Sequence, residues 1–218
     1  GWNISAFARY DINNFESVPQ KLPEIRLDKL STPIGDTGLY YSFLNSFAYL
    51  EEGALDSRRI DSLLRFQYPK RLASNWTILP IASARWTYYD EAVGGEESVS
   101  RLLTEVGFDS QWSFNRIWEV KNKTWDIDGL KHLVEPVLQY RYIPNADSGR
   151  DYIPQIEDDV FYTGLPLIDS YNETELDDLK ERHLLRAGLK QTFQTRDHTP
   201  GGAPTRNLLR FDAYQDFY

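Results

Sequence analysis

The sequence predicts an all-β protein built as an antiparallel meander of about nine strands. Apolar side chains recur at every second position in one segment after another, which is the period of a β-strand. Clusters of Gly, Pro, Asn and Asp mark turns between these segments, which are mostly about seven to ten residues apart. No segment of useful length between them has a helical period, which excludes parallel βαβ units.

Five expected strands occupy the first half of the chain. They cover residues 2–12, 22–30, 39–50, 59–68 and 76–89. The turns between them contain Asn13, Asn14 and Pro19, then Gly35, Asp36 and Gly38, then residues 51–57, and finally Pro69 to Asn75. Each strand has an apolar face opposite a polar one, as in 59–68, where Ile60 and Phe66 alternate with Asp61 and Arg65.

The segment 76–89 has the most regular alternation. Its even-numbered side chains are all apolar, and Trp76 and Trp86 lie ten residues apart on that face. At roughly 3.3 Å per residue and a tilt of about 45°, ten residues cover on the order of 23 Å along a membrane normal. Outer-membrane barrels separate their two aromatic girdles by an apolar band of about 25 Å. The tryptophan spacing therefore favours a membrane strand over a soluble core strand.

The second half contains four further expected strands and one long acidic segment. The strands cover residues 101–114, 131–145, 183–195 and 209–217. A polar link at 122–126 precedes the second of them, and a turn at 198–205 precedes the last. The acidic segment, about 145–182, keeps no sustained period. Loops longer than ~12–15 residues are usually functional or disordered, so this segment is a candidate functional element.

In the segment KHLVEPVLQYRYIPN, residues 131–145, alternation alone does not distinguish a soluble sheet from a membrane barrel. One face is mainly apolar and carries His132, Val134, Pro136, Leu138, Tyr140 and Tyr142. The other face mixes charged and amide side chains with three aliphatic ones. A soluble antiparallel sheet produces this pattern when one face packs on a core. A barrel produces it when the aromatic-ended face meets lipid and the polar face lines the lumen.

Composition excludes several classes of function. The net charge of -9 disfavours nucleic acid as a partner, and the absence of Cys excludes disulfides and Cys-ligated metals. Three isolated His, and acidic pairs without calcium-loop spacing, predict no metal site, no cofactor and no catalytic motif. Tyr, Phe and Trp are abundant, as in aromatic girdles. Gly1-Trp2-Asn3 lacks the features of a signal peptide, so we expect a segment of a longer chain.

Several blocks of the sequence resemble the outer-membrane lipopolysaccharide-assembly family LptD. HLVEPVLQYRYIP is similar to its His-x-x-Glu-Pro-x-Leu-x-Tyr-x-Tyr-x-Pro block, and the matching residues are His132, Glu135, Pro136, Leu138, Tyr140, Tyr142 and Pro144. Further similar blocks, in family order, are LPEIRL (22–27), GDTGLYYSF (35–43), RIDSLLRFQYPKR (59–71), AGLKQTFQTRD (187–197) and LRFDAYQDFY (209–218). The sequence departs from the family at Val137, where the family has Arg.

The resemblance implies transport rather than catalysis. Residues 1–218 would form a single segment from the middle of a large C-terminal barrel in the outer membrane of a Gram-negative bacterium. The barrel would insert lipopolysaccharide into the outer leaflet. The implied partners are lipopolysaccharide, outer-membrane lipids, an LptE-like lipoprotein plug, and an LptA-like periplasmic bridge that binds a domain absent from these residues.

The same interpretation assigns the two faces of the strands. The polar faces would line the lumen, with candidates Arg26, Arg65, Arg85, Glu135, Arg141 and Arg186. The arginines among them would contact lipid A phosphates or core sugars, because the guanidinium fork suits phosphate. The aromatic girdles would face lipid, with candidates Trp76, Trp86, Tyr140 and Tyr142. The acidic segment would fold into or over a barrel mouth.

Two alternatives stay open at this point. The first is another outer-membrane barrel, such as a porin-like channel. The second is a soluble β-sandwich that binds glycans, with Trp76, Trp86 and Trp112 as core or platform residues. A chain that stays soluble and monomeric without detergent would favour the sandwich.

Overall fold

The computed structural model describes residues 1–10, 20–52, 55–144, 149–157, 165–173, 176–198 and 205–218. Several expected features lie wholly or partly outside these ranges. They are the end of the first strand and the turn after it at 11–19, the turn at 51–57, parts of the acidic segment 145–182, and most of the turn at 198–205.

The described residues form eleven strands and one short 3-10 helix. The strands are β1 (Trp2–Arg9), β2 (Gln20–Pro33), β3 (Tyr40–Glu52), β4 (Leu55–Gln67), β5 (Lys70–Ala73), β6 (Trp76–Tyr89), β7 (Val99–Trp112), β8 (Phe114–Asn122), β9 (Ile127–Ile143), β10 (Arg182–Arg196) and β11 (Thr205–Phe217). The helix is η1 (Arg150–Tyr152). No helix in the described ranges has the length and hydrophobicity needed to cross a membrane.

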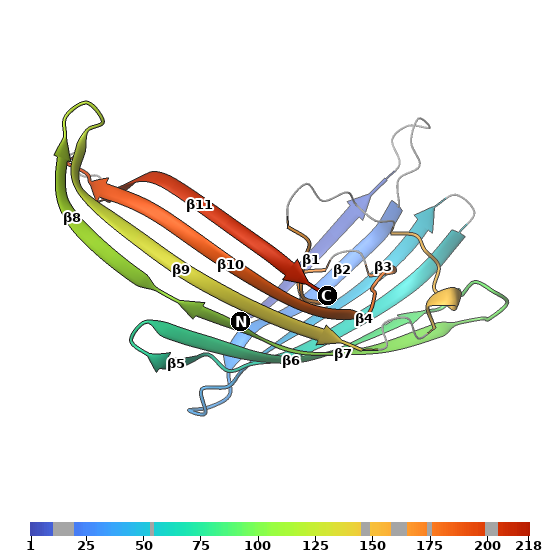
Figure 1. The fold of residues 1–218 in the computed structure, drawn as a ribbon. Helices are drawn as coiled ribbons and strands as arrows, with labels where there is room; N and C mark the ends of the chain where they lie inside the picture. The colour runs from blue at the N-terminus through green and yellow to red at the C-terminus, as the bar shows by residue number, and fades with distance from the viewer. Residues whose placement is uncertain (11–19, 53–54, 145–148, 158–164, 174–175, 199–204) are drawn as a thin grey trace. The chain divides into compact units, whose positions relative to one another are not determined.

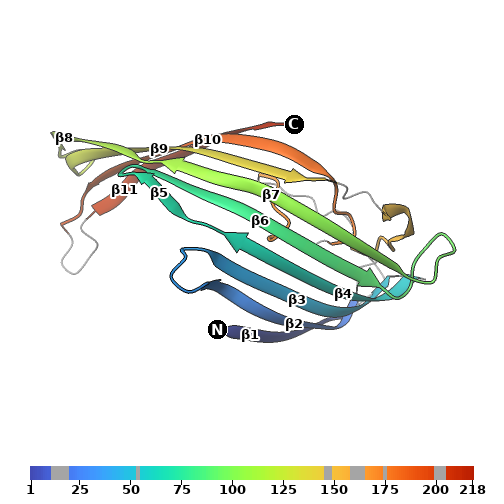
Figure 2. The same ribbon diagram turned by 90° about the horizontal axis from the view of Figure 1, so that it is seen from below.

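The strands belong to one antiparallel sheet, whose path runs β1-β2-β3-β4-β6-β7-β9-β10-β11. Figure 1 shows this path in colour from blue to red, and Figure 2 shows the same strands from below. β5 pairs with β6, and β8 pairs with β9, beside the path. The nine strands of the path are the nine that the sequence predicts, so the all-β antiparallel meander is confirmed.

Two strands, β5 and β8, occur where the sequence predicts none. β5 lies in the expected turn at 69–75 and pairs Lys70 with Ile78 and Arg71 with Thr77. Its four residues are too few to show a period. β8 pairs Phe114 with Val134, and its apolar residues Ile117 and Trp118 are adjacent, which breaks the alternation. The polar link is therefore a hairpin turn between β8 and β9.

Register brings charged residues of neighbouring strands to one face. β3 and β4 pair without a register shift, from Tyr40 opposite Gln67 to Glu52 opposite Leu55. β4 and β6 pair Asp61 with Thr87, and residues directly opposite in an antiparallel pair share a face. The polar phases of these strands therefore lie on the same side of the sheet.

The chain divides into two compact units, which are described separately below. Unit 1 comprises Gly1–Tyr68, Pro80–Gly107 and Arg141–His183. Unit 2 comprises Pro69–Leu79, Phe108–Tyr140 and Leu184–Tyr218. The expectation that residues 1–218 act as a single segment of one domain stays a prediction.

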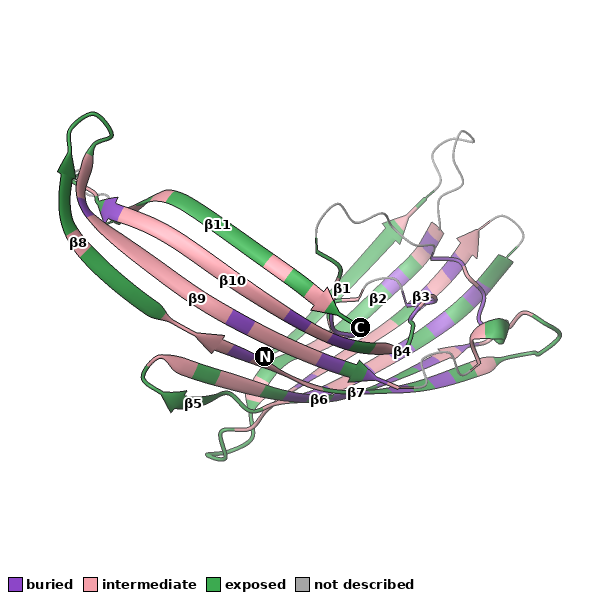
Figure 3. Cartoon of the chain, in the orientation of Figure 1, coloured by how far each residue is buried: buried purple, intermediate pink, exposed green. Residues whose placement is uncertain are grey.

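In unit 1 the strands bury a polar face and expose an apolar one. On β6, Arg85 is 5% exposed and its neighbour Trp86 is 41% exposed. On β7, Glu105 is 2% exposed and its neighbour Val106 is 50% exposed. Buried and exposed bands alternate along these strands in Figure 3. Other exposed residues of this apolar face are Ile25, Leu27, Phe47, Ile60, Phe66 and Leu102. We call the two sides the charged face and the apolar face.

Candidate functional site

The charged face of unit 1 carries a cluster of buried arginines. Strands β4, β6, β7 and β9 each place at least one of them there, and every one is 5% exposed or less. The members are Arg59, Arg65, Arg85, Arg101 and Arg141, which we call the arginine cluster. Burial of a charge is costly unless the charge is paired, so these side chains need acidic partners.

Two of those partners come from the strands themselves. Asp61 on β4 accepts hydrogen bonds from Arg85 Nε at 2.9 Å and Nη2 at 3.0 Å, which is a two-pronged contact. The hydroxyl of Thr87 also donates to Asp61, at 2.8 Å. Glu105 on β7 lies 3.7 Å from Arg141 Nε.

The remaining partners come from the acidic segment, whose described residues 149–157, 165–173 and 176–181 we call the acidic loop. Asp177 is its most buried carboxylate. One oxygen accepts from Arg59 at 2.9 Å and from the Tyr89 hydroxyl at 2.7 Å. The other accepts from the backbone N–H groups of Ile156 at 3.2 Å and Glu157 at 3.0 Å. Asp177 therefore joins both ends of the loop to the strands.

Asp169 holds the middle of the acidic loop. Its carboxylate lies 3.4 Å from Arg65 and 3.7 Å from Arg141. The guanidinium of Arg65 also lies over the ring of Tyr171, 4.7 Å from the centroid, as a cation–π contact. Asn172 donates its backbone N–H to Asp169 at 3.1 Å, which fixes the local turn.

Glu157 binds two cations at once. It accepts a hydrogen bond from Arg59 at 2.5 Å and forms an ion pair with Lys21 of β2. Burial alone would raise the pKa of this carboxyl, but the charges and hydrogen bonds of Arg59 and Lys21 together outweigh it and lower the pKa to about 2. Glu157 is therefore ionised at any physiological pH.

The main chain and apolar side chains of the acidic loop also contact the strands. Arg85 donates to the carbonyl of Ser170 at 2.5 Å, and the Ser170 N–H donates to Glu105 at 2.6 Å. Arg101 donates to the carbonyl of Leu176. Two small clusters add apolar packing, one of Ala48, Leu50 and Ile156 and one of Leu103, Ile143, Leu176 and Leu179. A cavity of about 100 Å³ remains beside these contacts, between loop residues such as Tyr171 and the charged face.

The predicted lumen residues lie in three different places in the structure. Arg65, Arg85 and Arg141 meet in the arginine cluster. Arg26 pairs with Glu24 at 2.6 Å on its own strand. In unit 2, Glu135 accepts from Gln111 at 2.9 Å and Arg186 pairs with Asp216 at 2.6 Å. That these residues line a lumen stays a prediction.

The predicted girdle residues all make aromatic contacts. In unit 1, Trp86 stacks on Tyr88 at 6.1 Å and Tyr142 meets the ring of His183 edge-on at 5.6 Å. In unit 2, Trp76 stacks on Trp112 at 5.6 Å and Tyr140 lies 5.9 Å from Phe108. Trp86 and Tyr142 are each 41% exposed. That these rings meet lipid also stays a prediction.

Sequence reasoning did not single out Arg59, Arg101 or Asp177. Arg59 lies on the polar face of its strand with Arg65, and Arg101 lies on that of its strand with Glu105. The alternation that predicts the other lumen residues could therefore also have identified these two arginines. No sequence pattern identifies Asp177, because its partners Arg59 and Tyr89 are distant in the sequence. Within the described ranges, no group of three His, Asp or Glu side chains is arranged to hold a metal ion.

Comparison with known proteins identifies relatives of this chain. Residues 1–213 match the family model LptD, described as LPS transport system D. The chain is 27% identical, over 188 residues, to the LPS-assembly protein LptD of Pseudoalteromonas translucida (strain TAC 125). That alignment covers 78% of this chain and 24% of the relative, so the chain spans about a quarter of the length of the relative it matches.

Proposed function

The chain belongs to the LptD family, and we propose that its strands form part of the wall of an outer-membrane barrel that delivers lipopolysaccharide to the outer leaflet. The family match covers nearly the whole chain and concerns a lipopolysaccharide transport system, which supports the substrate. The sheet is antiparallel throughout its main path, as the wall of such a barrel must be. A Gram-negative outer membrane is the proposed location.

The observation that carries the membrane assignment is the inverted polarity of unit 1. Its strands bury arginines and carboxylates and expose large apolar side chains such as Ile60, Trp86 and Val106. In water this arrangement would leave a broad apolar surface uncovered, which soluble proteins avoid. In a bilayer the apolar face meets lipid and the charged face is shielded in the lumen. This polarity also disfavours the soluble β-sandwich, and the family match disfavours a porin-like channel.

The acidic loop has a defined role within this proposal. Its carboxylates occupy Arg59, Arg65 and Arg141, so lipid A phosphates can reach these arginines only when the loop leaves. We therefore assign the loop as a cover of the lumenal wall in unit 1 and not as a free extracellular segment. An LptE-like plug and an LptA-like bridge remain proposed partners of the full-length protein.

Depletion of the full-length protein in its Gram-negative host tests the function. Newly made lipopolysaccharide at the cell surface, measured with an antibody on intact cells, is expected to fall while lipopolysaccharide accumulates inside. Plasmid-borne protein should restore it. Unchanged delivery of new lipopolysaccharide during depletion would contradict the proposal.

A further inference from the structure

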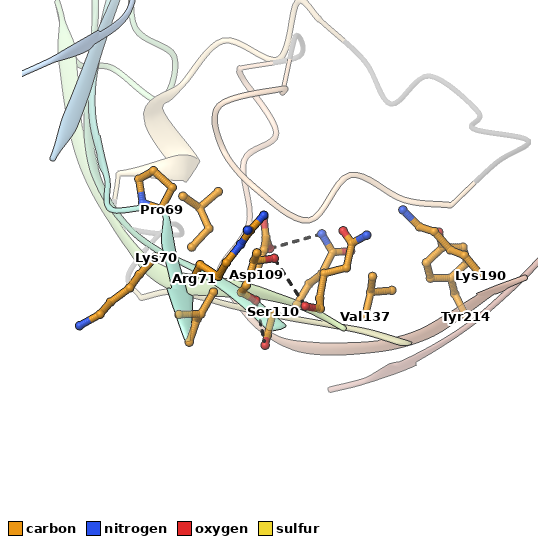
Figure 4. Close-up of a pocket in the computed structure, with 13 residues that line it drawn as sticks. Pro69, Lys70, Arg71, Asp109, Ser110, Val137, Lys190 and Tyr214 are labelled. Atoms are coloured by element: carbon orange, nitrogen blue, oxygen red, sulfur yellow. Dashed lines mark hydrogen bonds between the residues drawn. The ribbon is translucent and has the colours of Figure 1, made fainter. Parts of the chain in front are cut away.

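Unit 2 contains a cavity of about 500 Å³ that the proposed wall function does not explain. Small-ligand pockets typically measure about 300–1,000 Å³, so the size suits one or two sugar rings rather than a protein segment. Strands β6, β7, β9, β10 and β11 and the β5 hairpin all contribute to it, as Figure 4 shows. The lining residues are Pro69, Lys70, Arg71, Thr77, Ile78, Leu79, Asp109, Ser110, Gln111, Val137, Gln139, Lys190 and Tyr214.

A glycine on β10 positions the ring of Tyr214, which lines this cavity. Gly188 lies directly opposite Tyr214 of β11. A Cβ atom at position 188 would come within 2.5 Å of the Tyr214 ring and 2.7 Å of a Val137 methyl group. Only glycine therefore lets the ring lie over β10 against Val137. The result is an aromatic face with an apolar base, which is suited to stacking on the C–H face of a sugar.

Two glutamines supply polar groups beside that wall. Gln139 donates its amide N–H to Asp109 at 3.3 Å, and Gln111 donates to Glu135 at 2.9 Å. Both donations orient the side-chain amides and leave their carbonyl oxygens as acceptors. Such oxygens bind hydroxyl groups, because a hydroxyl donates one hydrogen bond and accepts others.

The lining of the cavity has a net positive charge. Three cations and a single carboxylate, Asp109, line it. In the described ranges, Arg71 and Lys190 have no carboxylate within ion-pair distance, and Asp212 opposite Lys190 pairs with Arg210 at 2.9 Å instead. In Figure 4, Arg71 and Lys190 lie toward opposite ends of the lining, and the amino group of Lys70 points away. By contrast, the arginine cluster of unit 1 is paired with its own acidic loop.

We infer that the unit 2 cavity is a subsite for an acidic sugar, phosphorylated or carboxylated, of the transported lipopolysaccharide. The inference rests on the proposed function. Tyr214 stacks on the sugar ring, the glutamine carbonyls accept its hydroxyls, and Lys190 and Arg71 bind anionic groups at the two ends of the cavity. Val137 and Gln139 share the alternating phase of Arg141 along β9, so in the proposed barrel the subsite faces the lumen.

In-cell photocrosslinking of the full-length protein tests the subsite. A photoreactive phenylalanine analogue at Leu79 is expected to form an adduct that an antibody to lipopolysaccharide detects. Arg71→Glu with Lys190→Glu should lower the adduct about tenfold or more, because two charge-assisted contacts are reversed. Tyr214→Leu should lower it, whereas Tyr214→Phe should keep it. Lys131→Glu, a matched change on β9 outside the cavity, should leave it unchanged. Equal amounts of folded protein in the outer membrane are verified for every variant.

Three results would overturn the subsite. They are an adduct at Leu79 with a protein only, no lipopolysaccharide adduct at Leu79, or an adduct that the double charge reversal leaves unchanged. The depletion experiment is independent of these outcomes. Loss of surface lipopolysaccharide on depletion, together with a negative crosslink, would reject the subsite and leave the transport function standing.

Discussion

Replacement of Asp177 by asparagine should release the acidic loop of unit 1. The carboxylate accepts from Arg59 and Tyr89 on one oxygen and from two backbone N–H groups on the other. An asparagine amide keeps one acceptor oxygen but places an NH₂ group where the second oxygen was. Either orientation of the amide therefore sets donors against donors, and it also removes the charge that pairs with Arg59.

The structure sets the size of this effect. Asp177 and Arg59 are 0% and 1% exposed at their side chains, so their ion pair is buried. Loss of one partner of a buried pair costs about 3–5 kcal/mol, which corresponds to a rise of roughly 10²- to 10³-fold or more in the loop-opening equilibrium. The neighbouring Asp178 pairs with Arg150 and Lys180, which are 32% and 52% exposed. Asp178→Asn is the matched control and should cost only about 0–1 kcal/mol.

Hydrogen exchange of the full-length protein measures the opening. Backbone amides of Ile156 and Glu157, which donate to Asp177, should exchange faster in Asp177→Asn by the factor above and change little in Asp178→Asn. Amides in the β10–β11 ladder of unit 2 serve as an internal reference, because they pair with the neighbouring strand and lie outside the acidic loop. Equal acceleration in the two variants, or none in Asp177→Asn, would refute the assignment of Asp177 as the main anchor.

Three further predictions concern pH, the apolar face and the packing of Tyr214 on Gly188. The pKa of Glu157 is lowered to about 2, so its contribution to docking of the acidic loop is complete above about pH 4.5 and declines as the pH falls toward 2, by up to about 3 kcal/mol. Protection factors of the loop amides at pH 3 and pH 6, which correct for the pH dependence of intrinsic exchange, check this, and Glu157→Gln should remove the contribution of Glu157. Val106→Arg should destabilise the proposed barrel by about 2–4 kcal/mol in urea unfolding from lipid, whereas an equal cost for Val106→Leu would contradict a lipid-facing position. Gly188→Ala should lower the free energy of unfolding by about 1–3 kcal/mol through the clash with Tyr214, and most of that loss should disappear in a double-mutant cycle with Tyr214→Ala. Additive losses would contradict the packing of Tyr214 on Gly188.

The alternation of apolar and polar side chains predicts most of the strands. The segment 76–89 is predicted and observed with the same bounds, because a two-residue period over fourteen residues has no helical interpretation. β5 and β8 were missed for opposite reasons. One is too short for any period, and the other has adjacent apolar residues at Ile117 and Trp118, so its pairing depends on β9 rather than on its own pattern.

The candidate site was predictable on the strands and not in the loop. Alternation alone placed Arg65, Arg85 and Arg141 on polar faces, and the structure brings them together. The partners Asp169 and Asp177 come from a segment without a period, and their contacts span long sequence separations. No local rule relates such residues, because the contacts exist only after the sheet has formed.

The most direct test of the central claim is a spin-label scan along β6 of the full-length protein in outer membranes. Single cysteines at positions 82 to 87 of an otherwise cysteine-free protein would carry the label. Collision with oxygen, which dissolves in lipid, is predicted to peak at 82, 84 and 86 and to be low at 83, 85 and 87, where the side chains are buried on the charged face. Access of a polar nickel complex at 82, 84 and 86, or no period of two, would contradict a wall strand whose apolar face meets lipid.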